Sequence, residues 1–196
     1  MLKRLFNIII STLGLIILLP LFVVLSIAIL FDSKGGVFYK QWRVGKDNSD
    51  FQLYKFRSMA VGADKKGLLT VGQKDIRITK VGSFIRQYKL DELPQLFNVI
   101  KGDMNLVGPR PEVRKYVDLY TKEQRDVLNV RPGITDYASI EYKNENEILE
   151  HAEDSEKTYI NIVMPHKLEL NKKYLENPSL THDIKLIFKT LLIVFK

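Results

Sequence analysis

The chain has 196 residues, with 30 Lys and Arg side chains against 23 Asp and Glu, and it contains no cysteine. The lack of cysteine excludes disulfides, thiolate metal sites, cysteine nucleophiles and lipidation on cysteine. The net charge of +7 favours an anionic partner, such as membrane headgroups, phosphorylated small molecules or nucleic acid.

An apolar run from Leu5 to Phe31 opens the chain, with Pro20 near its middle. As a helix the run reaches roughly 40 Å, which exceeds the hydrocarbon thickness of a bilayer, about 30 Å. Proline removes one backbone donor and clashes with the carbonyl four residues earlier, so it divides the run into two arms that are each too short to span. We therefore expect residues 1–31 to form a re-entrant membrane hairpin, a helix-break-helix that enters and leaves one leaflet.

Positive charges flank this run on both sides, with Lys3 and Arg4 before it and Lys34, Lys40 and Arg43 after it. The positive-inside rule favours the cytoplasmic side for both ends, which a re-entrant hairpin satisfies and a straight span does not. Two alternatives stay open: a proline-kinked transmembrane helix, and a cleaved signal peptide, whose apolar region is usually shorter. Membrane attachment favours lipid and phosphate over nucleic acid as partners.

The remaining residues, 32–196, are enough for one domain with its own core. Alternating residues in Val37 to Val44 and Phe51 to Arg57, with a turn at Gly45 to Asn48 between them, predict a β-hairpin. Residues 62–72 are small and polar without periodicity, which indicates a mobile surface loop and a candidate cover for a site.

Helical patterns dominate the middle of the chain. Apolar spacing predicts helices over Arg77 to Lys89 and over Glu112 to Leu128. Another helix is expected from Asp91 to Lys101, because Pro94 suits its first turn and Gly102 suits the position after its end.

The later segments are less regular. Met104 to Glu112 is predicted to be a Gly/Pro loop, and the acidic stretch from Glu141 to Glu156 a solvated surface helix. Thr181 is expected to cap an amphipathic C-terminal helix in which apolar residues oppose Lys185 and Lys189. This helix packs either in the core or on the membrane surface. The expected fold class is α/β, mostly helical with a small β-hairpin.

Adjacent carboxylates at Asp91 and Glu92 are the first candidate for chemistry. At a helix N-terminus, unpaired N–H groups and the macrodipole favour an ionised Asp91, as a carboxylate nucleophile requires, and they also attract phosphate. Two carboxylates approach a phosphate only if cations neutralise them, so the idea requires a magnesium ion and arginines such as Arg86, Arg110 and Arg131. The alternative is that Asp91 only caps its helix and Glu92 is solvated.

Arg110 lies between Pro109 and Pro111, and a following proline restricts it to extended conformations. A stiff loop of this kind suits bidentate phosphate recognition, although an incidental arginine in a braced surface loop is an equal alternative. The three histidines show no metal-ligand spacing, and the sequence has no phosphate-binding glycine loop or dinucleotide fingerprint.

Taken together, several segments resemble the bacterial sugar transferase family, specifically the small monotopic phosphoglycosyl transferases. The similarity extends over nearly the whole chain, including the proline-broken N-terminus. The matching residues are Lys55–Met59, Asp75, Arg77, Thr79, Gly82, Arg86, Leu90–Val99, Lys101–Met104, Leu106–Glu112 and Arg131–Thr135.

This resemblance implies transfer of a sugar 1-phosphate from a UDP-sugar to polyprenol phosphate, usually undecaprenyl phosphate, with release of UMP. It implies that Asp91 attacks the phosphate that bears the sugar, giving a covalent aspartyl phosphosugar, and that Glu92, together with Asp91, binds Mg²⁺. Polyprenol phosphate then attacks that intermediate, which predicts ping-pong kinetics. Basic motif positions that we predict to bind phosphates are Lys55, Arg77, Arg86, Arg110 and Arg131.

The resemblance also implies a re-entrant anchor at residues 1–31 and a catalytic domain at 32–196 on the cytoplasmic face of the bacterial inner membrane. Two departures stand out. Family members often carry serine before the proline, where this chain has Leu19, and a Gly, an apolar or aromatic residue, Ala and Gln where this chain has residues 136–139, Asp-Tyr-Ala-Ser. The second departure predicts a changed donor preference if that segment shapes the pocket.

Two other functions remain open. A catalytically silent membrane scaffold would use its basic surface to bind anionic lipids or an assembly partner. A single-span protein would instead carry an extracytoplasmic binding domain. The donor sugar, the glycan pathway and the oligomeric state are not encoded in these motifs.

Overall fold

The computed structural model describes residues 1–67, 69–72 and 75–194. It is a mostly helical α/β fold, as predicted, and it has two small sheets where the sequence predicted one hairpin. Its strands are β1 (Phe38–Val44), β2 (Asp50–Phe56), β3 (Asn105–Val107) and β4 (Gly133–Thr135). Its α-helices are α1 (Leu2–Asp32), α2 (Lys80–Gln87), α3 (Gln95–Lys101), α4 (Arg114–Val117), α5 (Tyr137–Glu141), α6 (Glu145–Glu150), α7 (Ser155–Thr158), α8 (Met164–Glu176) and α9 (Leu180–Val194). Short 3-10 turns η1 (Lys46–Asn48), η2 (Ala63–Lys66), η3 (Leu90–Glu92) and η4 (Gln124–Asn129) and a π-helical turn η5 (Tyr159–Val163) join them.

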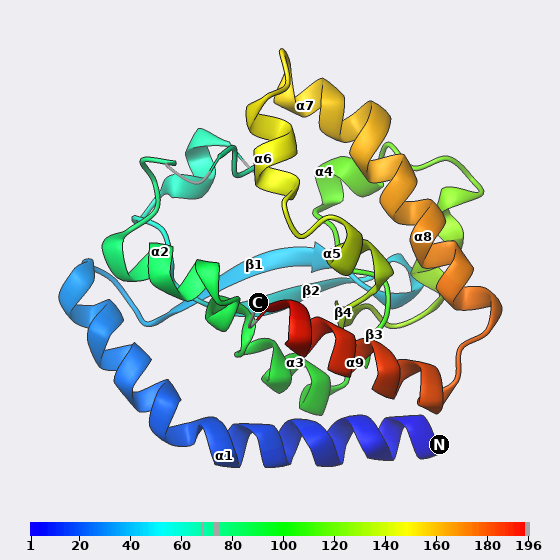
Figure 1. Ribbon diagram of the computed structural model, residues 1–196, viewed down its shortest axis with the longest axis horizontal. Helices are drawn as coiled ribbons and strands as arrows, with labels where there is room; N and C mark the ends of the chain where they lie inside the picture. The colour runs from blue at the N-terminus through cyan, green and yellow to red at the C-terminus, as the bar shows by residue number, and fades with distance from the viewer. Residues whose placement is uncertain (68, 73–74, 195–196) are drawn as a thin grey trace.

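Helix α1 runs along one side of the molecule and bends along its length (Figure 1). It is one continuous helix with Pro20 inside it, whereas the sequence predicted two arms separated by a break. It is the one helix in the described part of the chain that is long and apolar enough to cross a membrane. One face packs on the domain through Phe22, Leu25 and Ile29, which are buried. The opposite face leaves apolar side chains exposed, such as Ile17 at 73%.

A polar stripe attaches the first half of α1 to the domain. The Arg4 guanidinium donates to the carbonyls of Val99 (2.6 Å) and Ile100 (2.9 Å) at the end of α3, where helix carbonyls lack partners. Three residues further along, Asn7 is 1% exposed and donates to the side chain of Asn105, which begins β3. Helix α1 is therefore joined to α3 and β3 by side-chain hydrogen bonds.

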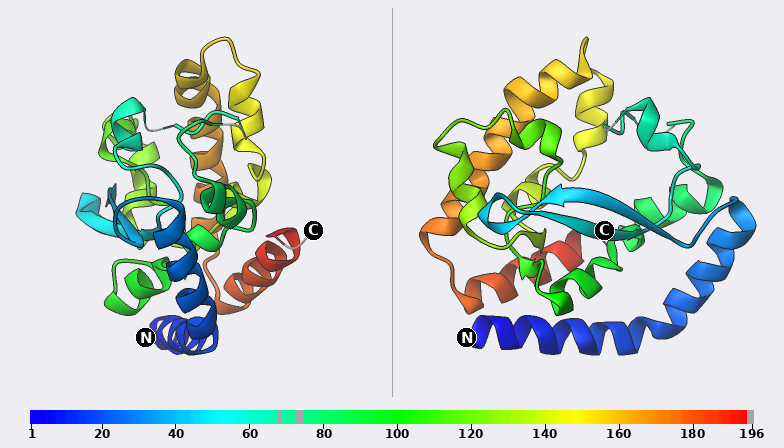
Figure 2. Two further views of the ribbon diagram at one scale, coloured as in Figure 1. Left: turned by 90° about the vertical axis from the view of Figure 1, so that its left-hand side faces the viewer. Right: turned by 180° about the vertical axis from the view of Figure 1, so that it is seen from behind.

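The predicted hairpin is confirmed, because β1 and β2 pair antiparallel with Phe38 opposite Phe56 and Val44 opposite Asp50. The hairpin crosses the molecule between α1 on one side and α6–α8 on the other (Figure 2). Asn98, buried on α3, fixes β2 to this helix: its side chain accepts from the Tyr54 amide (3.0 Å) and donates to the Gln52 carbonyl (2.7 Å).

Strands β3 and β4 form a short parallel pair that the sequence analysis did not find, since residues 104–112 were expected to be a loop. Each strand has three residues, too few to show alternation. Gly108 follows β3 and Gly133 begins β4; a Cβ on Gly133 would overlap the Gly108 backbone, and a Cβ on Gly108 would overlap the Arg131 carbonyl. The parallel pairing brings the two segments that follow the strands to the same end of the pair.

Two predicted helices are wrong in extent. The residues from Glu112 to Leu128 form only α4 and the turn η4, although the apolar positions that suggested a helix, such as Tyr116 and Val127, are buried. The acidic stretch is not one solvated helix, because it breaks into α5, α6 and α7, and Leu149 on α6 is buried. In both segments the apolar side chains are buried by short helical turns and not by one long helix.

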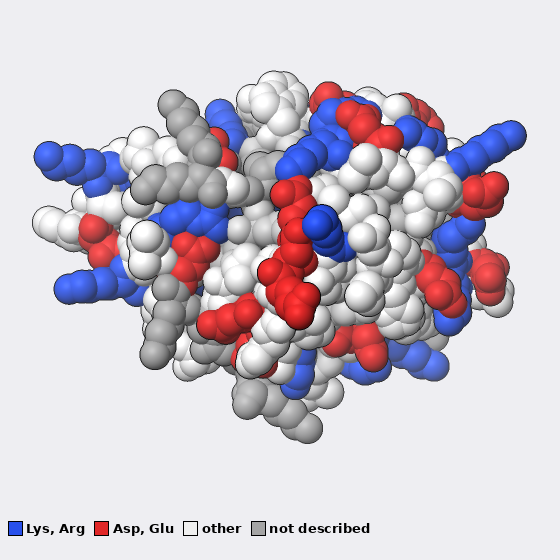
Figure 3. All heavy atoms as spheres, turned by 90° about the horizontal axis from the view of Figure 1, so that it is seen from above, with Lys and Arg blue, Asp and Glu red and all other residues white. Residues whose placement is uncertain are grey.

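The C-terminal helix α9 has both characters that the sequence left open. Leu186 is buried at 2% exposure, whereas Phe188 (64%) and Leu192 (68%) face outward. Its first turn is closed by the side chain of Ser179, which accepts from the His182 amide (3.2 Å), and not by Thr181 as predicted. The face of the molecule turned away from α1 carries Lys and Arg together with Asp and Glu (Figure 3).

Candidate active site

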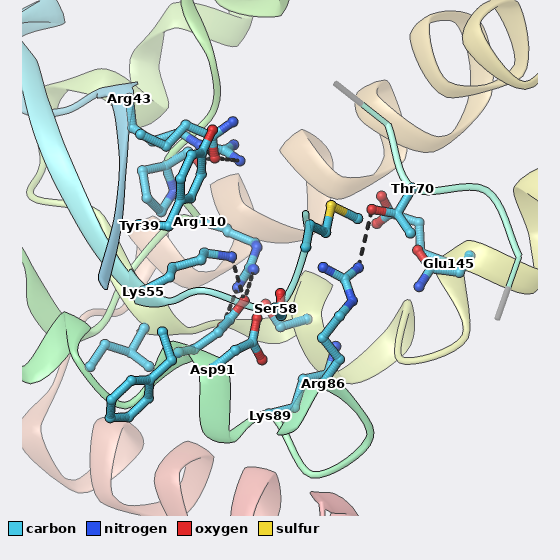
Figure 4. Close-up of a pocket in the computed structure, with 18 of the residues that line it drawn as sticks. Tyr39, Arg43, Lys55, Ser58, Thr70, Arg86, Lys89, Asp91, Arg110 and Glu145 are labelled. Carbon is cyan, nitrogen blue, oxygen red and sulfur yellow. Dashed lines mark hydrogen bonds and ion pairs between the residues drawn. The ribbon is translucent and has the colours of Figure 1, made fainter. Parts of the chain in front are cut away.

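A single large cavity of about 1250 Å³ contains the carboxylate pair. Its wall includes the hairpin, the loop at 60–72, α2, η3, the segment after β3, and parts of α5, α6, α8 and α9. One side is polar and holds Asp91 and Glu92 among basic residues (Figure 4). Leucines on η3 and α3 and the isoleucines Ile187 and Ile193 of α9 provide apolar wall. The cavity therefore offers both a charged and an apolar environment.

Two cations from distant parts of the chain clamp Glu92. Lys55, on β2, lies 3.0 Å from Glu92 Oε1, and Arg110 grips the carboxylate in a bidentate manner, with Nη1 3.0 Å from Oε2 and Nη2 on Oε1. The Glu92 side chain is only 12% exposed, so the alternative that it is solvated is wrong. A bidentate arginine fixes a carboxylate in orientation as well as in charge.

Asp91 differs from its neighbour. It is 5% exposed, and among the described residues none donates a hydrogen bond to its carboxylate. The dyad lies on the 3-10 turn η3, and α3 begins only at Gln95 with Pro94 at its N-cap position, so the prediction that Asp91 opens or caps this helix is wrong. Lys89, in the left-handed region at φ 54°, starts the turn. The result is a carboxylate that lines the cavity and accepts no hydrogen bond from the part of the chain that the structure describes.

The environment shifts the two carboxyl groups in opposite directions. Burial raises the pKa of Asp91; Lys55 opposes this and the charge of Glu92 adds to it. Burial would also raise the pKa of Glu92, but Arg110 and Lys55 together hold that pKa well below its usual range. Glu92 is thus the firmly ionised member. Ionisation of Asp91 depends on Lys55, Arg86 and Lys89, and not on a helix N-terminus as predicted.

Two further predicted residues line the same cavity with other partners. Arg86, on α2, donates to the Thr70 hydroxyl (3.1 Å) and has its charge near Asp91. Arg77 donates to Asp75 (2.6 Å) and to the carbonyls of Gly67 and Leu69, both at 2.6 Å, so it organises the loop expected to cover the site. Described residues of that loop, among them Gly62, Gly67 and Thr70, line the cavity.

Arg131 is the predicted residue that the structure does not bring to the cavity. It is exposed, and its Nε donates to the Gly102 carbonyl (2.8 Å) after α3. Conversely, Arg43, Lys89 and Asp136 were not predicted as site residues. Arg43 pairs with Glu112 (3.0 Å) at the cavity wall, and Lys89 precedes Asp91 by two residues, which was the available signal.

The carboxylate dyad is a candidate site for Mg²⁺. Among the described residues there is no group of three or more His, Asp and Glu side chains that could hold a metal. Magnesium, however, is commonly held by one or two carboxylates while substrate phosphates and waters complete its coordination. The unpartnered carboxylate of Asp91 beside Glu92 fits that pattern, with phosphate as the missing ligand.

Comparison with known proteins places the chain in a family. The model of the family described as "Bacterial sugar transferase" matches residues 1–196. The chain belongs to the bacterial sugar transferases, in agreement with the resemblance seen in its motifs.

Individual relatives carry more specific names. The chain is 38% identical over 192 residues to UDP-N-acetylgalactosamine-undecaprenyl-phosphate N-acetylgalactosaminephosphotransferase of Aeromonas hydrophila, covering 96% of this chain and 42% of the relative. It is 37% identical over 198 residues to UDP-glucose:undecaprenyl-phosphate glucose-1-phosphate transferase of Klebsiella pneumoniae, covering 99% and 39%. Uncharacterized sugar transferase EpsL of Bacillus subtilis is 38% identical over 190 residues, covering 96% and 85%. The chain thus spans about two fifths of the length of the first two relatives.

Proposed function

We propose that this protein transfers a sugar 1-phosphate from a UDP-sugar to undecaprenyl or another polyprenol phosphate and releases UMP. The observation that carries the proposal is the pairing of an unpartnered buried carboxylate, Asp91, with a clamped one, Glu92, in a cavity rich in cations. The names of the Aeromonas hydrophila and Klebsiella pneumoniae relatives include a UDP-sugar and undecaprenyl phosphate, and they support these substrate classes.

In this proposal Asp91 is the nucleophile. Its carboxylate oxygen bonds to the phosphorus that bears the sugar, and the bond from that phosphorus to the oxygen bridging the two phosphates breaks, so UMP leaves with the electron pair. A phosphate oxygen of the polyprenol phosphate then bonds to the same phosphorus, and the bond to Asp91 breaks. The carboxylate is regenerated and the product is a polyprenyl diphosphosugar.

The surrounding cations have separate tasks in this reaction. Lys55 and Arg110 hold Glu92 ionised and oriented, while Arg86 and Lys89 favour ionised Asp91 and can contact donor phosphates. We propose that Arg77 acts through the loop that it holds and that Arg131 binds phosphate outside the cavity. Asp91 and Glu92 would hold Mg²⁺, which supplies neutralisation of phosphate charge when bound.

The apolar wall suits the acceptor. Leu90, Leu93 and the α9 residues Ile187 and Leu191 line the cavity that holds the dyad. Phe188 and Leu192 lie on the outward side of the same helix, exposed to the surroundings. A polyprenol phosphate embedded in the membrane needs an apolar path to a charged centre, and this wall supplies one.

We propose a re-entrant topology for α1, with the catalytic domain on the cytoplasmic face of the inner membrane. Both ends of α1 contact the same domain: Lys3 pairs with Asp183 (2.7 Å), and Asp32 accepts from the Val81 amide (2.9 Å). A helix tied to one domain at both ends has both ends on one side of the bilayer. The bend of α1 (Figure 1), the presence of Pro20 inside this helix and its exposed apolar face fit this arrangement.

Activity is tested by UMP release from a panel of UDP-sugars, with Mg²⁺ and undecaprenyl phosphate present or omitted. Asp91→Asn is expected to abolish turnover while the protein stays folded. Asp118→Asn, at an exposed aspartate outside the cavity lining, is the matched control. Retained turnover in Asp91→Asn contradicts the nucleophile assignment, and a folded protein silent on the whole panel favours the scaffold alternative.

Topology is tested by labelling, which the chain simplifies because it has no cysteine. Single cysteines replace Leu2, at the start of α1, and Ser49, in the hairpin turn. The proposal predicts that neither reacts with an impermeant maleimide added outside intact cells and that both react after lysis. Labelling of Leu2→Cys alone indicates a straight span, and labelling of Ser49→Cys alone an extracytoplasmic domain.

A further inference from the structure

Asp136 is a buried carboxylate that the proposed reaction does not use. It is 1% exposed and follows β4, beside the segment that follows β3. Its two oxygens accept different backbone amides: Oδ1 accepts from Ser139 (2.6 Å), which caps α5, and Oδ2 accepts from Arg110 (3.0 Å). The sequence analysis noted residue 136 only as a departure from the family pattern, which has glycine there.

The contact with Arg110 has few substitutes. Arg110 stands between Pro109 and Pro111, and proline has no N–H, so the Arg110 amide is the one backbone donor in this tripeptide. A hydrogen bond to an ionised acceptor is about twice as strong as a neutral one. Asp136 therefore holds the backbone of a segment that has no other amide with which to be held.

The neighbouring backbone makes this bond part of a rigid unit. The Gly108 amide donates to the Thr135 carbonyl (3.1 Å), and the Gly133 amide donates to the Pro109 carbonyl (3.0 Å). The Asp136 bond extends the β3–β4 pairing by one step, up to the residue whose guanidinium grips Glu92. A displacement of the Arg110 backbone would move both hydrogen bonds between the Arg110 guanidinium and Glu92.

We infer that Asp136 is a positioning residue for the active site: by accepting the Arg110 amide it sets the geometry with which Arg110 holds Glu92. A glycine at this position, as in the family pattern, offers no such acceptor, so the device belongs to this chain's departure from that pattern. The inference rests on the proposed function for its kinetic test but not for its structural one.

The test must separate this role from helix capping. Asp136→Ser retains a good N-cap residue for α5 but has no second oxygen for the Arg110 amide. Asp154→Ser is the matched control, because Asp154 caps α7 by accepting from Lys157 (3.0 Å) and lies on the surface. Arg110→Lys keeps the charge but loses the bidentate grip.

The kinetic readout is kcat/KM for donor turnover, combined in a double-mutant cycle. We expect Asp136→Ser to lower it roughly 10-fold, as for loss of one charge-assisted hydrogen bond, and Asp154→Ser to leave it unchanged. Because Asp136 acts through Arg110, Asp136→Ser combined with Arg110→Lys should be little worse than Arg110→Lys alone. Wild-type turnover in Asp136→Ser, or losses that multiply in the double variant, overturns the inference.

The structural readout is hydrogen exchange by mass spectrometry of a peptide spanning residues 107–113, in which the two prolines carry no amide. Asp136→Ser should add about one rapidly exchanging amide to this peptide, and Asp154→Ser should add none. Unchanged exchange overturns the inference even if turnover is never detected. A wild-type protein silent on every donor, with the exchange shift present, instead rejects the proposed function and keeps the Asp136 contact.

Discussion

Replacing Arg110 with methionine removes one of the two cations that clamp Glu92. Charges about 4 Å apart attract by roughly 4 kcal/mol at an effective dielectric constant near 20, and breaking a buried pair costs about 3–5 kcal/mol because the remaining charge is uncompensated. Lys55 still lies 3.0 Å from Glu92, and the Arg110 side chain is 32% exposed. We therefore expect Arg110→Met to lower the free energy of unfolding by about 2 kcal/mol, below that range.

The assay is thermal unfolding of the detergent-solubilised protein, without metal or substrate. A loss of about 2 kcal/mol corresponds to a Tm lower by roughly 4–8 °C in a protein of this size. The control is Arg114→Met, which breaks a pair with Asp50 (2.6 Å) whose side chains are 37% and 48% exposed. That exposed pair should contribute less than about 1 kcal/mol.

A double variant makes the reasoning refutable. Arg110→Met and Glu92→Gln each remove one side of the same ion pair, so the double variant should lose less stability than the sum of the two single losses. If its loss instead equals the sum of the two single losses, or if Arg110→Met is as stable as Arg114→Met, the clamp does not stabilise a buried charge in the way described.

Three further predictions concern charge and hydrogen bonding. The depressed pKa of Glu92 contributes stability above the ordinary value of 4.5, so the Tm advantage of wild type over Glu92→Gln should shrink as the pH falls below about 4.5; an advantage independent of pH contradicts this. Asn98→Asp should lower the free energy of unfolding by about 3 kcal/mol, because a carboxylate oxygen would replace the amide nitrogen that donates to the Gln52 carbonyl (2.7 Å). This loss should diminish in acid, and an unchanged Tm would refute the prediction. Lys3→Met leaves the Asp183 carboxylate, 2% exposed, without its cation, and should cost about 2–3 kcal/mol, largely recovered by adding Asp183→Asn; equal Tm values for all three proteins would refute the pairing.

Periodic segments were predictable from the sequence because local pattern and burial agree there. The β1–β2 hairpin alternates, and α3 ends at Gly102, which has the left-handed φ of 105° that favours glycine. Where apolar spacing reflected burial alone, as in residues 112–128, the prediction of one helix failed. The strands β3 and β4 stabilise each other across about 28 residues of sequence, so no local pattern predicts them.

The site was predictable in composition more than in geometry. The dyad and three of its basic neighbours, Lys55, Arg86 and Arg110, were named from motifs, and the structure brings them to one cavity. Which cation binds which carboxylate depends on long-range packing, so the clamp on Glu92 could not be derived. Asp136 acts through a backbone amide 26 residues away, a contact that residue type and spacing do not reveal.

In the proposed reaction Asp91 carries the sugar phosphate between donor and acceptor. This covalent step is tested by the intact mass of the protein after incubation with Mg²⁺ and a UDP-sugar that supports UMP release, without polyprenol phosphate. We expect wild type to gain the mass of one sugar phosphate, Asp91→Asn to gain none, and added polyprenol phosphate to remove the adduct. UMP release that requires polyprenol phosphate in the first turnover, with no adduct on the wild-type protein, would contradict the assignment of Asp91 as the nucleophile.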